Sequence, residues 1–170
     1  AIMADTDGVA EMLTEGDGPH GLAWREWVEA AQVVTDDGGF EDHGVLDQIA
    51  AIASPRVALE ASAFMYVEPT HALIAVDVNT GGDTSPASSL KANLAACKVL
   101  PRALRLRGLG GQIVIDMAPM PKTMRKQVEA AMRSAFRADS IDTALVGWTP
   151  LGHFELQRKR ERLPIPMGLA

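Results

Sequence analysis

The chain has little cysteine and few aromatic residues, and both shortages narrow its chemistry. Cys97 is the only cysteine among the 170 residues, which excludes an intramolecular disulfide and a multi-cysteine zinc site within one chain. A reducing cytoplasm is therefore the simplest expected location. Three Trp, one Tyr and four Phe make up all the aromatic side chains, so recognition by extensive base stacking is not expected.

Long apolar runs are also absent. No stretch approaches the roughly 18 apolar residues that a membrane-spanning helix requires, and the mean hydropathy is +0.03. The first 13 residues lack the basic region and apolar stretch that mark a secretory signal. We therefore expect a globular chain without a membrane partner, and its length suits one domain with an appendage.

Basic residues are nearly missing from the first 50 positions. That segment carries 12 acidic side chains and one basic one, Arg25, whereas residues 51–170 carry 15 basic and 10 acidic side chains. The net charge of −6 therefore does not exclude a polyanionic partner, because local patches determine such binding. The acidic front itself is expected to be a solvated surface or a mobile arm.

Residues 1–39 are predicted to form an acidic, partly helical N-terminal segment. We expect a short apolar helix within residues 1–18 and a second helix over residues 20–34. Trp24 and Trp27 lie three positions apart in the second helix, which favours docking contacts over a base-stacking platform. The loop over residues 35–39 is the best internal boundary. Residues 40–163 then form the main domain, and residues 164–170 a tail.

The main domain alternates strands and helices. We expect a helix over residues 41–54, a hairpin of strands 62–68 and 71–79, a helix over 88–107, a strand over 112–117, a helix over 121–137 and a strand over 141–148. Pro101 should kink or split its helix, and residues 151–161 are interpreted as a closing charged run. This order predicts an α/β fold: a mixed sheet with a parallel β-α-β-α-β core and the hairpin as an antiparallel edge.

Two apolar strands each carry an aspartate at the carboxyl end. Asp77 shares one strand face with Asn79, and Asp116 ends the next predicted strand. If the helix between them is a right-handed crossover, the strands run parallel and the aspartates meet where α/β sheets place ligands. Two converging carboxylates repel unless a cation joins them, and their hard oxygen atoms suit Mg²⁺. Either aspartate alone could cap the following loop, but the matched pair with Asn79 favours a metal site.

Basic side chains precede and follow these strands and could contact phosphate. The candidate RNA-backbone contacts are Arg105, Arg107, Arg158 and Arg160. Arg105 and Arg107 could instead complement the negative end of their helix, and the final basic run could be a solvated tail. The four histidines lack metal-ligand spacing, and Cys97 is expected to be buried and inert. The glycine-rich loops lack the Gly-Lys-Ser/Thr of a nucleotide-binding loop.

Five sequence blocks resemble the ribonuclease E/G family in their order and spacing. They are Ala75–Gly81, Asn93–Ala96, Leu104–Gly111, Ile113–Asp116 and Phe154–Arg158. The resemblance covers roughly Phe40 to Leu163 and implies the DNase I-like catalytic subdomain. It implies Mg²⁺-dependent endonucleolytic cleavage of single-stranded RNA that leaves 5′-phosphate ends. Asp77 and Asp116 stand at the positions of the metal-binding aspartates, and Asn79 at that of the catalytic asparagine.

The resemblance also reveals departures. The family commonly carries a further acid after the second aspartate, where this chain reads Met117–Met120 with Pro119, and an Arg where this chain has Gly82. The S1 RNA-binding domain and the 5′-end sensor of full-length relatives have no counterpart here, so residues 1–39 are expected to be a remnant of the preceding region. That N-terminal portion is a potential partner, and homo-oligomer formation stays open.

Two other functions remain open from the sequence alone. A non-catalytic interaction or assembly module would keep the fold and dock through the acidic front and the two tryptophans. A metal-dependent phosphohydrolase would act on small molecules rather than on RNA.

Overall fold

The computed structural model describes residues 2–5, 8–13, 32–34 and 38–166, and the chain divides into two compact units, residues 1–50 and 51–170. The first unit contains a three-stranded sheet. Strands β1 (Ile2–Asp5) and β2 (Gly8–Leu13) are antiparallel, and β3 (Gln32–Val34) runs parallel to β2. The helix expected within residues 1–18 is therefore wrong where the chain is described, because Ile2–Asp5 and Gly8–Leu13 pair as strands. The second predicted helix lies outside the described residues up to residue 31, and its last three residues form β3.

The helix expected over residues 41–54 is present in two pieces. Helix α2 covers Gly39–Asp42 and α3 covers Val45–Ala53. Gly44 lies between them with a φ of +64°, a left-handed conformation that ends one helix and re-aims the chain. The division into two units falls within α3, after Ala50.

The second unit is built on a six-stranded sheet with the order β4-β5-β6-β7-β9-β8. The strands are β4 (Arg56–Ala58), β5 (Phe64–Pro69), β6 (Ile74–Asn79), β7 (Gly111–Asp116), β8 (Thr143–Trp148) and β9 (Phe154–Arg158). Only β6 and β7 are parallel neighbours, and the other pairs are antiparallel. The predicted hairpin and the mixed α/β sheet are thus confirmed.

Strand β9 was not expected, and it changes the parallel core. It enters the sheet between β7 and β8 and pairs antiparallel with both. Strand β8 therefore runs in the same direction as β7 without touching it as a neighbour. Strand β4, which extends the sheet beyond the hairpin, was also missed because three residues are too few for a periodic signal.

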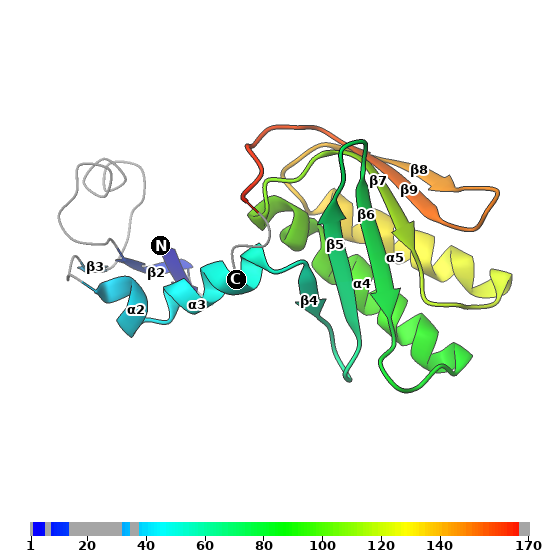
Figure 1. The fold of residues 1–170 in the computed structure, drawn as a ribbon, viewed down its shortest axis with the longest axis horizontal. Coiled ribbons are helices and arrows are strands. Elements are labelled where there is room, and N and C mark those ends of the chain that lie inside the picture. Colours follow the sequence, from blue (N-terminus) through cyan, green and yellow to red (C-terminus); the bar gives the residue numbers. More distant parts are fainter. Residues whose placement is uncertain (1, 6–7, 14–31, 35–37, 167–170) are drawn as a thin grey trace. The chain divides into compact units, whose positions relative to one another are not determined.

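Two helices cover one face of this sheet, as Figure 1 shows. Helix α4 (Pro86–Leu106) connects β6 to β7, and the 3₁₀ turn η1 (Lys122–Met124) with helix α5 (Arg125–Arg137) connects β7 to β8. Apolar side chains of the sheet alternate so that one set packs under these helices in a continuous core. Pro101 is buried inside α4 and does not split it.

The other face of the sheet carries the polar side chains. Along β6 and β7, buried positions alternate with exposed or half-buried ones, so Asp77 and Asp116 lie on the face that α4 and α5 leave open. None of the helices in the described parts of the chain is both long enough and apolar enough to span a membrane.

Candidate active site

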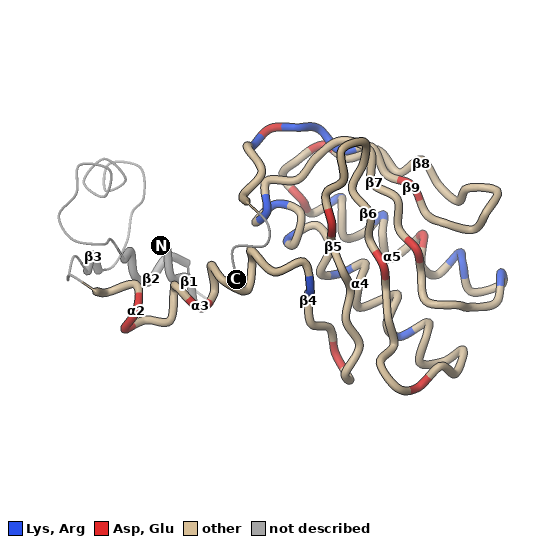
Figure 2. The backbone as a smooth tube through the Cα atoms, in the orientation of Figure 1, with Lys and Arg blue, Asp and Glu red and all other residues tan. Residues whose placement is uncertain are grey.

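Asp77 and Asp116 lie directly beside each other. In the parallel register of β6 and β7, the Cα atoms of the two residues are paired, and neighbouring strands are about 4.8 Å apart. Both side chains are exposed, that of Asp116 to 68%. Figure 2 shows acidic residues on both strands. Like charges directly opposite each other destabilise a sheet, so this pair is unfavourable for the fold alone.

Asn79 is part of the same group. Its Nδ2 donates a hydrogen bond to Asp77 Oδ2 over 2.9 Å, because residues two apart on a strand share a face. This bond orients one carboxylate and leaves the amide oxygen of Asn79 as a further acceptor. The sequence placed all three residues together, and the structure does bring them together.

The loop after β6 leads into the start of α4. Gly81 has a φ of +78°, and a Cβ atom there would lie 2.8 Å from the carbonyl oxygen of Ser62, so the turn requires glycine. Asp83 Oδ1 accepts a hydrogen bond from the Ser85 backbone N–H over 2.9 Å. That bond lowers the pKa of Asp83 below its usual value. Ser85 then caps the helix through the backbone N–H of Ser88.

The chain after Asp116 is held by a buried asparagine of α4. Asn93 is fully buried, its Nδ2 donates to the Ala118 carbonyl oxygen, and its Oδ1 accepts from the Ala118 backbone N–H, both over 2.9 Å. This two-bond clamp satisfies backbone groups that have no strand partner. It positions the segment that begins immediately after Asp116.

His153 lies immediately before β9, close to one carboxylate of the acidic pair. Its Nε2 lies 3.8 Å from Asp116 Oδ1, and about a third of its side chain is exposed. Sequence analysis assigned no role to His153 beyond noting that the histidines lack metal-ligand spacing, because β9 was not recognised. A predicted strand over Phe154–Arg158 next to β7 would have placed His153 at this edge.

The donors fit a hard divalent cation. Two carboxylates in register and an amide oxygen are the oxygen ligands that Mg²⁺ accepts alongside several waters. Within the described residues, no group of three or more His, Cys, Asp or Glu side chains is arranged to hold a metal ion. Protein ligands would thus come from Asp77 and Asp116, with open positions for water or phosphate. Because both carboxylates are exposed, burial adds little to the energetic cost of the pair, and the unfavourable contribution that remains is the proximity of two like charges in register.

The arginines expected to bind RNA serve other contacts. Arg158 is fully buried, with its Nη1 2.6 Å from Asp139 Oδ2 and 2.8 Å from Thr143 Oγ1. Arg105 also pairs with Asp139. Arg107 is buried and donates to the carbonyl oxygens of Ser54 and Ala103, and burial lowers its pKa. Guanidinium groups held in the interior cannot reach a phosphate, so Arg107 and Arg158 are not retained as RNA contacts.

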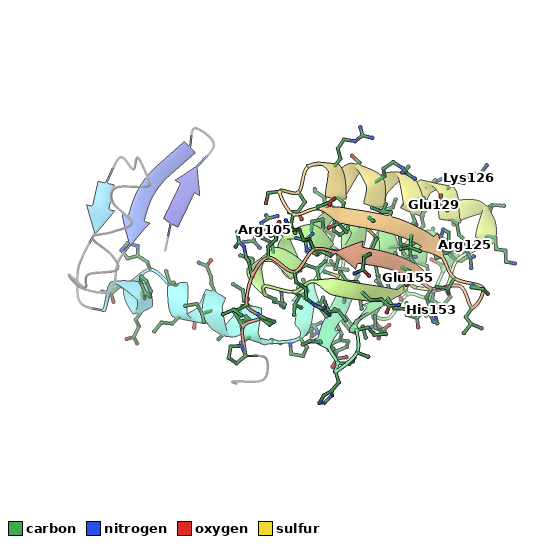
Figure 3. All side chains as sticks on the ribbon, turned by 90° about the horizontal axis from the view of Figure 1, so that it is seen from above. Arg105, Arg125, Lys126, Glu129, His153 and Glu155 are labelled. Atoms are coloured by element: carbon green, nitrogen blue, oxygen red, sulfur yellow. The ribbon has the colours of Figure 1, made fainter. Side chains whose placement is uncertain are left out.

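These arginines also lie at the end of the sheet opposite to the acidic pair. Arg158 is paired with Gly111, the first residue of β7, whereas Asp116 is the last, about 16 Å further along the strand. Arg160 is exposed at the same end as Arg158, where its Nε donates to the Gly110 carbonyl oxygen over 3.3 Å. Figure 3 shows Arg105 at one end of the sheet and Arg125, Lys126 and His153 toward the other.

The cations nearer the acidic pair begin η1 and α5. Lys122 and Lys126 are exposed, and the guanidinium of Arg125 lies 4.4 Å from the centroid of the Trp148 ring. The Trp148 Nε1 donates to Glu129 Oε1 over 2.7 Å. Lys122, Arg125 and Lys126 follow the carboxyl end of β7 in the chain, and they were not among the four arginines predicted as RNA-backbone contacts.

Cys97 takes no part in this site. It is buried in α4, and burial raises its pKa to about 12. The expectation of a buried thiol is confirmed.

Comparison with known protein families places the chain in one of them. The model of the ribonuclease E/G family matches residues 23–161. The chain belongs to the ribonuclease E/G family. Ribonuclease G of Salmonella typhimurium is 31% identical over 128 residues, which are 72% of this chain and 26% of the relative. Ribonuclease E of Nostoc sp. is 37% identical over 113 residues, 63% of this chain and 16% of the relative.

A plant relative shows the same partial coverage. The chloroplastic ribonuclease E/G-like protein of Arabidopsis thaliana is 33% identical over 132 residues, 72% of this chain and 13% of the relative. The chain therefore spans about a quarter or less of the length of these curated relatives.

Proposed function

We propose that this chain is the catalytic part of a Mg²⁺-dependent endoribonuclease that cleaves single-stranded RNA and leaves 5′-phosphate ends. The observation that carries the proposal is the pairing of Asp77 with Asp116 in adjacent parallel strands, within a chain of the ribonuclease E/G family. Membership supports an RNA-processing endonuclease. The oxygen donors support the metal.

Each residue of the site has a distinct role in this proposal. Asp77 and Asp116 hold Mg²⁺, which when bound supplies Lewis-acid stabilisation of charge on the scissile phosphate. Asn79 fixes the Asp77 carboxylate through its Nδ2 and presents its amide oxygen to the attacking water or orients the phosphate. His153, beside Asp116, limits how that carboxylate can turn.

Cations at the same end of the sheet would hold the RNA backbone. Lys122, Arg125 and Lys126 follow Asp116 in the chain, and Arg160 remains an exposed candidate at the other end. Binding that rests on such contacts weakens steeply with salt. Cytoplasmic location, homo-oligomer formation and cooperation with an N-terminal S1 and 5′-sensor portion remain part of the proposal.

The test is cleavage of a fluorescent, AU-rich single-stranded RNA with Mg²⁺, using Asp77→Asn. Removing one of two metal-binding carboxylates should slow cleavage by about 100-fold, which corresponds to about 2.7 kcal/mol. Asp142→Asn is a matched control, because Asp142 is exposed and precedes β8 at the other end of the sheet. It should cleave within about twofold of the parent.

Equal cleavage by the parent and Asp77→Asn would refute the metal mechanism. Ligation of an RNA adaptor to the 5′ ends of the cleavage products tests for the 5′-phosphate directly, because the ligation requires that group. The limited coverage of the relatives favours one alternative, a non-catalytic module that keeps the fold. Absence of cleavage together with undetectable Mg²⁺ binding would select that alternative.

A further inference from the structure

Two aromatic side chains lie on the open sheet face beside the acidic pair. In the register of β5 and β6, Tyr66 is paired with Asp77 and Phe64 with Asn79. The residues between and after them, Met65 and Val67, are completely buried. Because side chains alternate along a strand, Phe64 and Tyr66 must point away from the helices, toward the face that carries the carboxylates.

These rings form a small platform with an arginine. The Phe64 and Tyr66 centroids are 5.5 Å apart at an interplanar angle of 81°. From the edge strand β4, the Arg56 guanidinium lies 4.4 Å from the Phe64 centroid, and Arg56 is paired with Tyr66 in the sheet. We call Arg56, Phe64 and Tyr66 the aromatic platform.

The platform is accessible. Both rings are half-buried and Arg56 is exposed. Across the described part of the chain, no hydrogen bond or ion pair engages the Tyr66 hydroxyl or the Arg56 guanidinium. Aromatic rings on a sheet face usually gain from being covered. A guanidinium that keeps its donors free can stack on a ring and still contact a phosphate.

We infer that the aromatic platform stacks one unpaired nucleobase of the RNA next to the scissile phosphate. This inference rests on the proposed function, and it names how that site positions its substrate. Residues opposite each other in an antiparallel pair have Cβ atoms about 5 Å apart, so a base lying on Tyr66 keeps its own phosphate within reach of Asp77. Aromatic rings and arginine planes accept any unstacked base.

The low aromatic content of the chain is compatible with a single stacking platform. Eight aromatic residues cannot line a long strand of RNA, but one base at the cleavage position needs only one platform. A single stack favours single-stranded RNA over a duplex, because a paired base is already stacked on its neighbours.

The first test uses the fact that Tyr66 is the only tyrosine of the chain. Incorporation of 3-fluorotyrosine therefore gives a single ¹⁹F resonance that reports on this ring. We would titrate the labelled chain in EDTA, so that no cleavage occurs, with a short oligoadenylate and with an abasic ribose-phosphate oligomer of equal charge. Oligoadenylate should shift the resonance through the ring current of the stacked base, and the abasic oligomer should not.

Substitutions supply the second test. Tyr66→Leu should weaken oligoadenylate binding about tenfold, which is about 1.4 kcal/mol, and should leave binding of the abasic oligomer unaltered. Tyr66→Phe restores the ring and should recover binding. Arg56→Lys keeps the charge but loses the planar group, so it should weaken the binding of oligoadenylate more than the binding of the abasic oligomer. Circular dichroism establishes that each variant is folded.

The outcomes separate this inference from the proposed function. Cleavage of RNA without any base-dependent ¹⁹F shift would overturn the platform and leave the nuclease intact. A base-dependent shift in a chain that never cleaves RNA would keep the platform and overturn the nuclease. Equal shifts with both oligomers would also overturn stacking, because only charge is common to them.

Discussion

The two ends of strand β7 differ in how their charged side chains are paired. At the amino end, Asp139 is fully buried between Arg105 and Arg158, and its charge is compensated within the fold. At the carboxyl end, Asp77 and Asp116 lie side by side and exposed, and the imidazole Nε2 of His153 lies 3.8 Å from Asp116 Oδ1. Both ends carry charged residues, but only the amino end pairs its buried carboxylate with arginines of the same fold.

The charges at the amino end are paired within the fold, whereas those at the carboxyl end are left exposed beside each other. Removing one partner of a buried ion pair leaves an uncompensated charge in the interior, which strongly destabilises the fold. An exposed pair of like charges directly opposite each other adds no stability to the sheet, and under the proposed function a bound Mg²⁺ would offset the repulsion. The amino end of β7 therefore holds the sheet together, and the carboxyl end is available for chemistry.

Removing the buried ion pair at the amino end of β7 should have the largest effect on stability. Asp139→Ala removes the partner of the fully buried Arg158 guanidinium and should lower the free energy of unfolding by about 3–5 kcal/mol. Urea denaturation followed by circular dichroism measures this change. Asp142→Ala, an exposed acid three residues away, is the control and should change stability by no more than about 0.5 kcal/mol. A loss below about 1 kcal/mol for Asp139→Ala would contradict a structural role for this cluster.

The proximity of Asp77, Asn79 and Asp116 could be predicted from the sequence because it depends on local patterns of strands and helices. Apolar strands ending in Asp77 and Asp116, separated by one long helix, determine a parallel pair through the handedness of crossovers. Asn79 follows from strand alternation. None of these steps requires knowledge of a residue distant in the chain.

The amino end was misjudged because its partners are distant. Arg158 shares the buried side of β9 with Phe154 and Leu156. Because Arg158 is charged, the sequence does not show the apolar alternation by which a strand is recognised. Its partner Asp139 is 19 residues earlier, so no local pattern joins them. The positions of Arg105 and Arg107 could have been inferred, because they precede β7 whereas Asp116 ends it. One strand length separates them from the aspartates.

Relieving the repulsion at the carboxyl end should stabilise the fold. Asp116→Asn removes one of two like charges in register, so the free energy of unfolding without divalent ions should rise by about 0.5 kcal/mol. Mg²⁺ should stabilise the parent and leave this variant nearly unaffected, since ligand binding to the native state adds to stability. Thermal unfolding with and without Mg²⁺ measures both effects. A variant less stable than the parent in EDTA would mean that Asp116 supports the fold.

Asp83 is also exposed at the carboxyl end of the sheet, but its charge is compensated by a backbone N–H. The hydrogen bond from Ser85 lowers its pKa below the usual 3.8, so the folded state favours the charged form. The stabilisation is therefore fully present above about pH 3.8 and is lost as the pH falls through the lower folded pKa. Asp83→Asn keeps an acceptor oxygen without a titrating group, so its stability relative to the parent should rise on acidification. Urea midpoints at pH 7 and pH 3 measure this small change. A parent-to-variant difference that stays constant with pH would assign Asp83 to the uncompensated charges, alongside Asp77 and Asp116.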